Sequence, residues 1–208
     1  MPHITANGVE IYVETNGERV STPLLLVRGL GTQIIHWPRS MLEYLVNAGF
    51  FVVTADNRDA GLSQKFDDWG TVDTDDLARR VEEKLPITTA YSVSAFAEDQ
   101  FGVMDHFGIE RAHICGMSMG GMIVQTMAAT HPGRVISMTS IMSSSGNPEL
   151  PMGKPSARAL LLAEPENPND RQSVIDFTLR CDRVWGSPGY PFDEKERAAL
   201  IGRTYDRC

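Results

Sequence analysis

The stretch from Ala112 to Met122 constrains the fold most, because it joins a short apolar run to a helical pattern through a Gly-Met-Ser-Met-Gly turn centred on Ser118. A strand that enters a helix through so tight a turn strains the backbone of the central residue and leaves room only for small neighbours. Ser118 is then lifted clear of the sheet, at the positively polarised end of the following helix. The pattern also occurs by chance, so the rest of the chain must support it. With that support, we predict a nucleophilic serine of acyl-transfer chemistry.

Length and composition are those of one globular domain with an insert. The 208 residues carry 19 basic and 27 acidic side chains, and the net charge of -8 argues against nucleic acid or an anionic membrane as a partner. The N-terminus has no secretory signal and no apolar run reaches transmembrane length, so we expect a cytoplasmic protein. The odd set Cys115, Cys181 and Cys208 predicts reduced thiols, not a disulfide framework or a zinc site.

The order of periodic segments predicts an α/β fold. Two short strands at the N-terminus flank an Asn-Gly hairpin turn, and apolar runs separated by helical patterns follow. Such alternation indicates a mostly parallel sheet with helices on both faces. The expected strands are His3–Ala6, Val9–Thr15, Leu24–Val27, Phe50–Ala55, Ala112–Cys115 and Val135–Ser140, and the expected helices run from Pro38 to about Asn47, from Ser94 to Phe107 and from the serine turn to about Thr130.

Two loops follow buried strands at the edge where α/β folds place ligands. The first, Arg28-Gly29-Leu30-Gly31, has backbone N–H groups that can face an oxyanion, although a plain turn is the alternative. The second runs from Asp56 to Ser63, and we expect Asp56 and Arg58 to pair with each other or with backbone groups.

Two acidic or aperiodic segments carry no predicted site. Residues 65–76 are acidic and irregular, which is typical of a solvated surface, and their spacing does not suit a metal ion. Residues 81–91 are predicted to form a surface excursion.

Beyond Ser145, prolines separate short helical pieces. The pieces are Ala157–Leu162, Arg171–Arg180 and Asp193–Ile201, the last with a capping-box pattern. We expect an α/β core over residues 1–145 and a small helical cap over residues 146–208 that acts as a lid, or else a loosely packed extension.

Together these segments resemble the α/β-hydrolase fold, in particular bacterial esterases of the aclacinomycin methylesterase kind. The resemblance rests on Leu24–Gly31, on the Asp-x-Arg-x-x-Gly-x-Ser loop Asp56–Ser63, on the serine turn, and on Ser187–Phe192. It implies that Ser118 is the nucleophile and that the N–H groups of Leu30 and Met119 form the oxyanion hole. Gly29, Trp37 and Met117 are the expected substrate contacts. Arg28 stands where many members have histidine, without harm to a backbone donor.

The resemblance also implies two residues that the sequence does not place. In these hydrolases an acid and then a histidine follow the cap on later strands. The sequence ends at Cys208, inside the predicted cap, so we expect an amino-terminal part of a larger enzyme that lacks its C-terminal strands, or a protein completed by a second segment. Of the internal histidines only His36 lies at the correct edge of the sheet, and a polar loop residue is the plainer interpretation.

Two functions remain open at this point. The first is a serine hydrolase of carboxylic esters, with lactonase or cofactor-free haloperoxidase activity as variants of the same serine; an epoxide hydrolase or dehalogenase would need a carboxylate at position 118. The second is a catalytically incomplete remnant that binds a ligand or partner. We expect a small-molecule ester as the partner, no cofactor and no metal, and a missing C-terminal segment or self-association at the open edge formed by Val135–Ser140.

Overall fold

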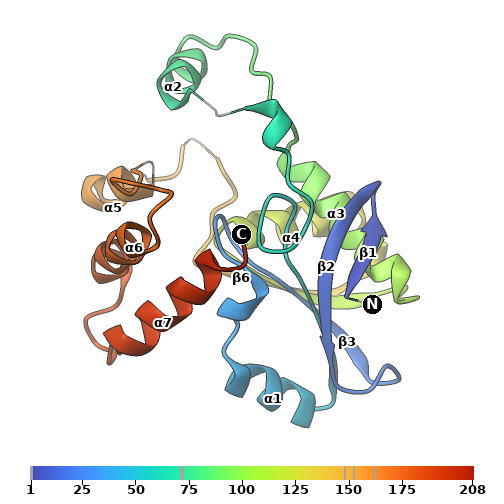
Figure 1. Ribbon diagram of the computed structural model, residues 1–208. Helices are drawn as coiled ribbons and strands as arrows, with labels where there is room; N and C mark the ends of the chain where they lie inside the picture. The colour runs from blue at the N-terminus through green and yellow to red at the C-terminus, as the bar shows by residue number, and fades with distance from the viewer. Residues whose placement is uncertain (1, 71–72, 148, 152, 162) are drawn as a thin grey trace. The chain divides into compact units, whose positions relative to one another are not determined.

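The computed structural model describes residues 2–70, 73–147, 149–151, 153–161 and 163–208 (Figure 1). The contacts divide the chain into two compact units, residues 1–147 and residues 148–208. The first unit holds the sheet, and the second is built from helices.

The sheet of the first unit has the strand order β1-β2-β4-β3-β5-β6 within the described residues. Strands β3, β4, β5 and β6 run parallel, whereas β1 and β2 pair antiparallel. This confirms the prediction of a mostly parallel α/β fold. The strands are β1 His3–Ala6, β2 Val9–Asn16, β3 Thr22–Val27, β4 Phe50–Ala55, β5 Ala112–Met117 and β6 Val135–Ile141.

Helices cover both faces of this sheet. The helices α3 (Val93–His106) and α4 (Met119–Thr130) pack on one face, and α1 (Arg39–Asn47) packs on the other. Strand β3 shows how the sequence divides its apolar residues, because Leu25 and Val27 join the α3/α4 core while Leu24 and Leu26 join the α1 core. Side chains alternate along a strand, so a continuous apolar run is the pattern of a strand buried on both faces.

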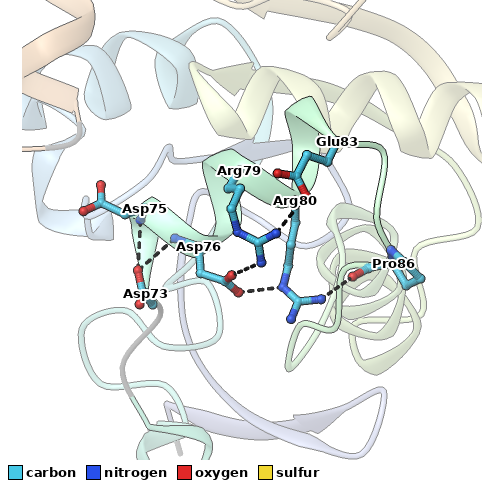
Figure 2. Close-up of polar contacts among 7 residues, drawn as sticks. All are labelled: Asp73, Asp75, Asp76, Arg79, Arg80, Glu83 and Pro86. Atoms are coloured by element: carbon cyan, nitrogen blue, oxygen red, sulfur yellow. Dashed lines mark hydrogen bonds and ion pairs between the residues drawn. The ribbon is translucent and has the colours of Figure 1, made fainter.

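The acidic segment before α3 contains a helix that the sequence analysis missed. Helix α2 spans Thr74–Glu82, and a 3₁₀ turn spans Asp67–Trp69; residues 71–72 of the same segment lie outside the described residues. Figure 2 shows the side chain of Asp73 accepting hydrogen bonds from the N–H groups of Asp75 and Asp76, which is an N-cap.

Ion pairs one turn apart continue along α2. Asp76 lies 2.6 Å from both Arg79 and Arg80, and Arg79 also reaches Glu83 at 2.8 Å (Figure 2). Hydrogen bonds from the two guanidinium groups lower the pKa of the Asp76 carboxyl. The described part of this segment is solvated, as predicted, but the prediction that it is irregular was wrong from Thr74 onward, because it weighed charge content and not the i, i+3 and i, i+4 spacing of opposite charges.

Strand β6 lies at one edge of the sheet and pairs with β5. Its middle side chains are exposed, and Ile136 and Met138 keep 43% and 42% of their surface accessible. The predicted apolar edge is therefore present in the structure.

The second unit contains α5 (Pro155–Leu161), α6 (Arg171–Trp185) and α7 (Glu194–Tyr205). Helices α6 and α7 extend beyond the predicted ranges, whereas Leu162, the last residue of the first predicted helix, lies outside the described residues. Asp193 caps α7 by accepting a hydrogen bond from the N–H of Glu196, as its pattern predicted. The two longer helices share a small apolar core and an ion pair, formed by Ile175, Leu179 and Ile201 and by Asp182 with Arg197.

Candidate active site

The predicted turn between β5 and α4 is present, and Ser118 is at its apex. Ser118 has φ 56° and ψ −122°, a left-handed region that serine rarely adopts, and its side chain is exposed. The close packing of the two flanking glycines explains why this conformation persists. A Cβ added at Gly116 would lie 2.7 Å from the backbone nitrogen of Gly121, and one added at Gly120 would lie 2.6 Å from the carbonyl oxygen of Arg28. Only glycine fits at either position.

Hydrogen bonds hold the serine backbone from both sides. The N–H of Ser118 donates to the carbonyl of Ile141 at 2.9 Å, and the carbonyl of Ser118 accepts from the N–H of Gly121 at 2.8 Å. The first bond ties the turn to the end of β6, and the second begins helix α4. Because α4 starts at Met119 and runs for 12 residues, the free N–H groups of its first turn lie next to the serine.

The loop that follows β3 lies directly against this turn. A Cβ added at Gly29 would lie 2.9 Å from the Cβ of Ser118 and 3.4 Å from the backbone nitrogen of Met119. Gly29 is buried, whereas Leu30 is 70% exposed and Met119 is half-buried. The structure therefore brings together the serine and the two segments that the sequence analysis expected to carry oxyanion donors.

The other two residues expected to contact substrate differ in burial. Trp37 is only 3% exposed and packs in the apolar cluster between the sheet and α1, so it offers little surface to a ligand. Its ring lies 4.7 Å from the guanidinium carbon of Arg28, which is a cation–π contact. Met117 is half-buried, and its sulfur lies 3.4 Å from a guanidinium nitrogen of Arg28.

Side-chain hydrogen bonds help to fix the loop between β3 and α1. Asp56, which is fully buried, accepts from the N–H of Ile34 at 2.7 Å. The amide nitrogen of Asn57 donates to the carbonyl of Arg28 at 2.9 Å, and the hydroxyl of Thr32 donates to the carbonyl of Gly29 at 2.9 Å.

The backbone contacts of Asp56 were predicted from the sequence, whereas those of Asn57 and Thr32 were not. Asp56 also accepts from the N–H of Leu62, and a Cβ on Gly61 would clash with its carboxylate. The Gly29-to-Thr32 turn was visible in the sequence as Gly-Leu-Gly-Thr, and Gly31 at φ 64° fits the position of such a turn that requires positive φ.

Arg58 makes a buried ion pair that the sequence did not reveal. Its guanidinium donates to both carboxylate oxygens of Asp99 in α3, at 2.7 and 2.6 Å, and not to Asp56. The rings of Phe66, Tyr91 and Phe96 surround the guanidinium carbon at 5.2 to 5.9 Å. Burial together with a hydrogen bond to Asp59 raises the pKa of the Tyr91 hydroxyl.

The histidines are spread over the first unit. His36 sits in the loop before α1, where its Nδ1 lies 3.0 Å from the nitrogen of Gln33. The other four histidines lie against groups away from the serine turn. His3 contacts the carbonyl of Leu62, and His106 packs against the ring of Phe107. His113 contacts the hydroxyl of Ser137, and His131 contacts the hydroxyl of Thr130.

A cysteine, Cys115, lies in the strand that leads into the serine turn. Cys115 is buried in β5, and this burial raises the pKa of its thiol.

In the part of the chain that the structure describes, no cluster of three His, Cys, Asp or Glu side chains is arranged to hold a metal ion. Over the same residues, no helix is long and apolar enough to cross a membrane.

The sequence and the fold of the chain are similar to those of known hydrolases. The chain is 27% identical to rhodomycin D methylesterase DauP of Streptomyces sp. (strain C5) over 93% of its length and spans 64% of that relative. It is 29% identical to epoxide hydrolase B of Mycobacterium tuberculosis over 88% of its length, covering 46% of that enzyme. The fold matches 2-hydroxy-6-oxo-6-phenylhexa-2,4-dienoate hydrolase of Rhodococcus sp. strain RHA1 with a TM-score of 0.68 at 22% identity, over 99% of this chain and 65% of that one. The model of the alpha/beta hydrolase fold matches residues 22–177, so the chain belongs to the α/β-hydrolase family.

Proposed function

We propose that this protein is a serine hydrolase that acts on carboxylic esters, with Ser118 as the nucleophile. The observation that carries the proposal is that Ser118 is exposed, has a positive φ, and lies next to Gly29 at the start of α4. Attack by its hydroxyl oxygen on an ester carbonyl would form a tetrahedral oxyanion. The N–H groups of Leu30 and Met119 belong to the two segments beside that position, and such donors stabilise the charge as it develops.

The methylesterase relative supports an ester as the substrate class. The residue type at position 118 supports the same choice, because a hydroxyl nucleophile forms an acyl-enzyme ester that water can hydrolyse. Carboxylate nucleophiles serve other hydrolases of this fold, so the epoxide hydrolase among the relatives does not direct the proposal toward epoxides. A base and an orienting acid must complete the reaction, and the chain spans 64% of the methylesterase it matches.

The test combines three measurements on the purified protein: its intact mass, turnover of a short-chain p-nitrophenyl ester, and labelling by a fluorophosphonate probe. Where the intact mass shows that the purified protein includes further residues that can supply the base and acid, Ser118→Ala should abolish labelling and lower turnover by about 10⁴-fold or more. Ser94→Ala, at an exposed serine in the first turn of α3, is the matched control and should change neither. A folded wild-type protein that neither labels nor turns over would favour the alternative of a binding protein that retains the serine turn as structure.

A further inference from the structure

Thr32 holds the peptide group that joins Gly29 to Leu30 in one orientation. Its carbonyl accepts two hydrogen bonds from Thr32, one from the hydroxyl at 2.9 Å and a longer one from the backbone N–H at 3.3 Å. In a trans peptide the carbonyl and the N–H point in opposite directions. When Thr32 binds the Gly29 oxygen, the N–H of Leu30 is therefore directed away from Thr32.

Both ends of this loop are anchored independently of Thr32. Asn57, itself 2% exposed, holds the carbonyl of Arg28, and its own side-chain oxygen accepts from Gln100 at 3.2 Å. Asp56 holds the N–H of Ile34 at the other end. The Gly29–Leu30 peptide lies between these anchors. Gly29 and Gly31 restrict its backbone angles less than other residues would, so the hydrogen bonds to its carbonyl help to fix its orientation.

We propose that Thr32 is a positioning residue for the oxyanion hole: its hydroxyl fixes the Gly29–Leu30 peptide so that the Leu30 N–H faces the carbonyl oxygen of the ester that Ser118 attacks. The inference rests on the proposed ester-hydrolase function. It is supported by the position of Gly29, whose Cα faces both Ser118 and the nitrogen of Met119. Thr32 makes no contact with substrate in this scheme and acts only through the peptide that it orients.

Loss of the Thr32 hydroxyl should lower kcat moderately and change KM little. One neutral hydrogen bond biases a local equilibrium by about threefold to tenfold, and the backbone N–H of Thr32 retains the turn when the hydroxyl is removed. Thr32→Val should therefore lower kcat by about threefold to tenfold and leave KM nearly unchanged, because the negative charge on the oxygen is absent from the bound ester and develops as the tetrahedral intermediate forms. Thr32→Ser keeps the hydroxyl and should restore most of the rate.

The matched control is Thr130→Val at the far end of α4, where the hydroxyl donates to the carbonyl of Thr126 at 2.9 Å. It removes the same group from the same kind of bond, so it reports the effect of the substitution on stability alone. A drop in kcat for Thr32→Val with rescue by serine, and no drop for Thr130→Val, supports the inference. Unchanged kcat in Thr32→Val, or equal losses in both valine variants that follow their thermal unfolding midpoints, overturns it. Absence of Ser118-dependent turnover in the wild-type protein would instead overturn the proposed function on which the inference depends.

Discussion

Asp99→Ala removes the acidic partner of a guanidinium that the fold buries. The side chains of Arg58 and Asp99 are 7% and 1% exposed, and two hydrogen bonds of 2.7 and 2.6 Å join them. Asp99 also accepts from the side-chain amide of Asn7 at 3.0 Å. With alanine at position 99, Arg58 would keep its charge among three aromatic rings without the carboxylate that neutralises it.

The free energy of unfolding should fall by about 3 to 5 kcal/mol, which is the usual cost of removing one partner of a buried ion pair and leaving the other charge uncompensated. For a chain of this size, each kcal/mol lowers the thermal midpoint by about 2 to 4 °C, so the shift should be about 6 to 20 °C. Urea denaturation followed by tryptophan fluorescence and circular dichroism measures the loss. Glu43→Ala is the control, because Glu43 and Arg39 form an ion pair with side chains 60% and 91% exposed; its cost should stay below about 0.5 kcal/mol.

A double variant separates the charge from the packing. Arg58→Met combined with Asp99→Leu removes both ions and fills the site with apolar side chains, which should recover most of the stability lost in Asp99→Ala. If Asp99→Ala costs no more than Glu43→Ala, the reasoning from burial is refuted. If instead the double variant is as unstable as Asp99→Ala, the shape of the pair and not the isolated charge sets its contribution.

Three further outcomes are expected. Gly120→Ala should destabilise the protein by about 1 to 3 kcal/mol or prevent folding, since the new Cβ would meet the backbone oxygens of Val27 at the end of β3 and of Arg28 just after it, whereas Gly133→Ala, which has open space around it, should be nearly neutral in urea denaturation. Iodoacetamide at pH 8 should modify the exposed Cys208 before the buried Cys115; burial raises the pKa of the Cys115 thiol and so reduces its thiolate fraction, and peptide mass spectrometry that finds Cys115 modified first would contradict this. Asp73→Ala should remove the N-cap of α2 and destabilise that helix by about 1 kcal/mol, which amide hydrogen exchange would detect as faster exchange in α2. Unchanged exchange would show that the cap is dispensable.

The elements that the sequence predicted well are those whose signal lies within a few residues. The apolar run of β3 predicted a strand buried on both faces, and the Asn7-Gly8 turn predicted the first hairpin, in which both residues have positive φ. The glycines around Ser118 predicted the strained turn because only small residues allow such a close approach. The assignment of donors to Leu30 and Met119 remains a prediction, supported by the position of Gly29 beside the serine.

Contacts between distant segments were not predictable in the same way. Nothing near Arg58 distinguishes Asp99, which is 41 residues away, from the other carboxylates of an acidic chain. Asn57 looked like an ordinary turn residue until the sheet placed it beside the carbonyl of Arg28, 29 residues earlier. Helix α2 was missed for a different reason, because its stabilising contacts are local charge pairs and not an apolar stripe.

The sequence by itself therefore determined the order of the strands along the chain and of the helices other than α2, the parallel character of the sheet, and the serine at the turn before α4. Backbone propensity, side-chain periodicity and glycine sterics act over a few residues, so they can be read without knowing the fold. The tertiary structure decided which distant groups meet: Asn57 on the carbonyl of Arg28, Asp99 on Arg58, and Trp37 in the core beneath Arg28. The first two pairings each select one partner among many of equal chemistry, and only the packing of β3, β4 and α3 brings the selected groups within hydrogen-bonding distance.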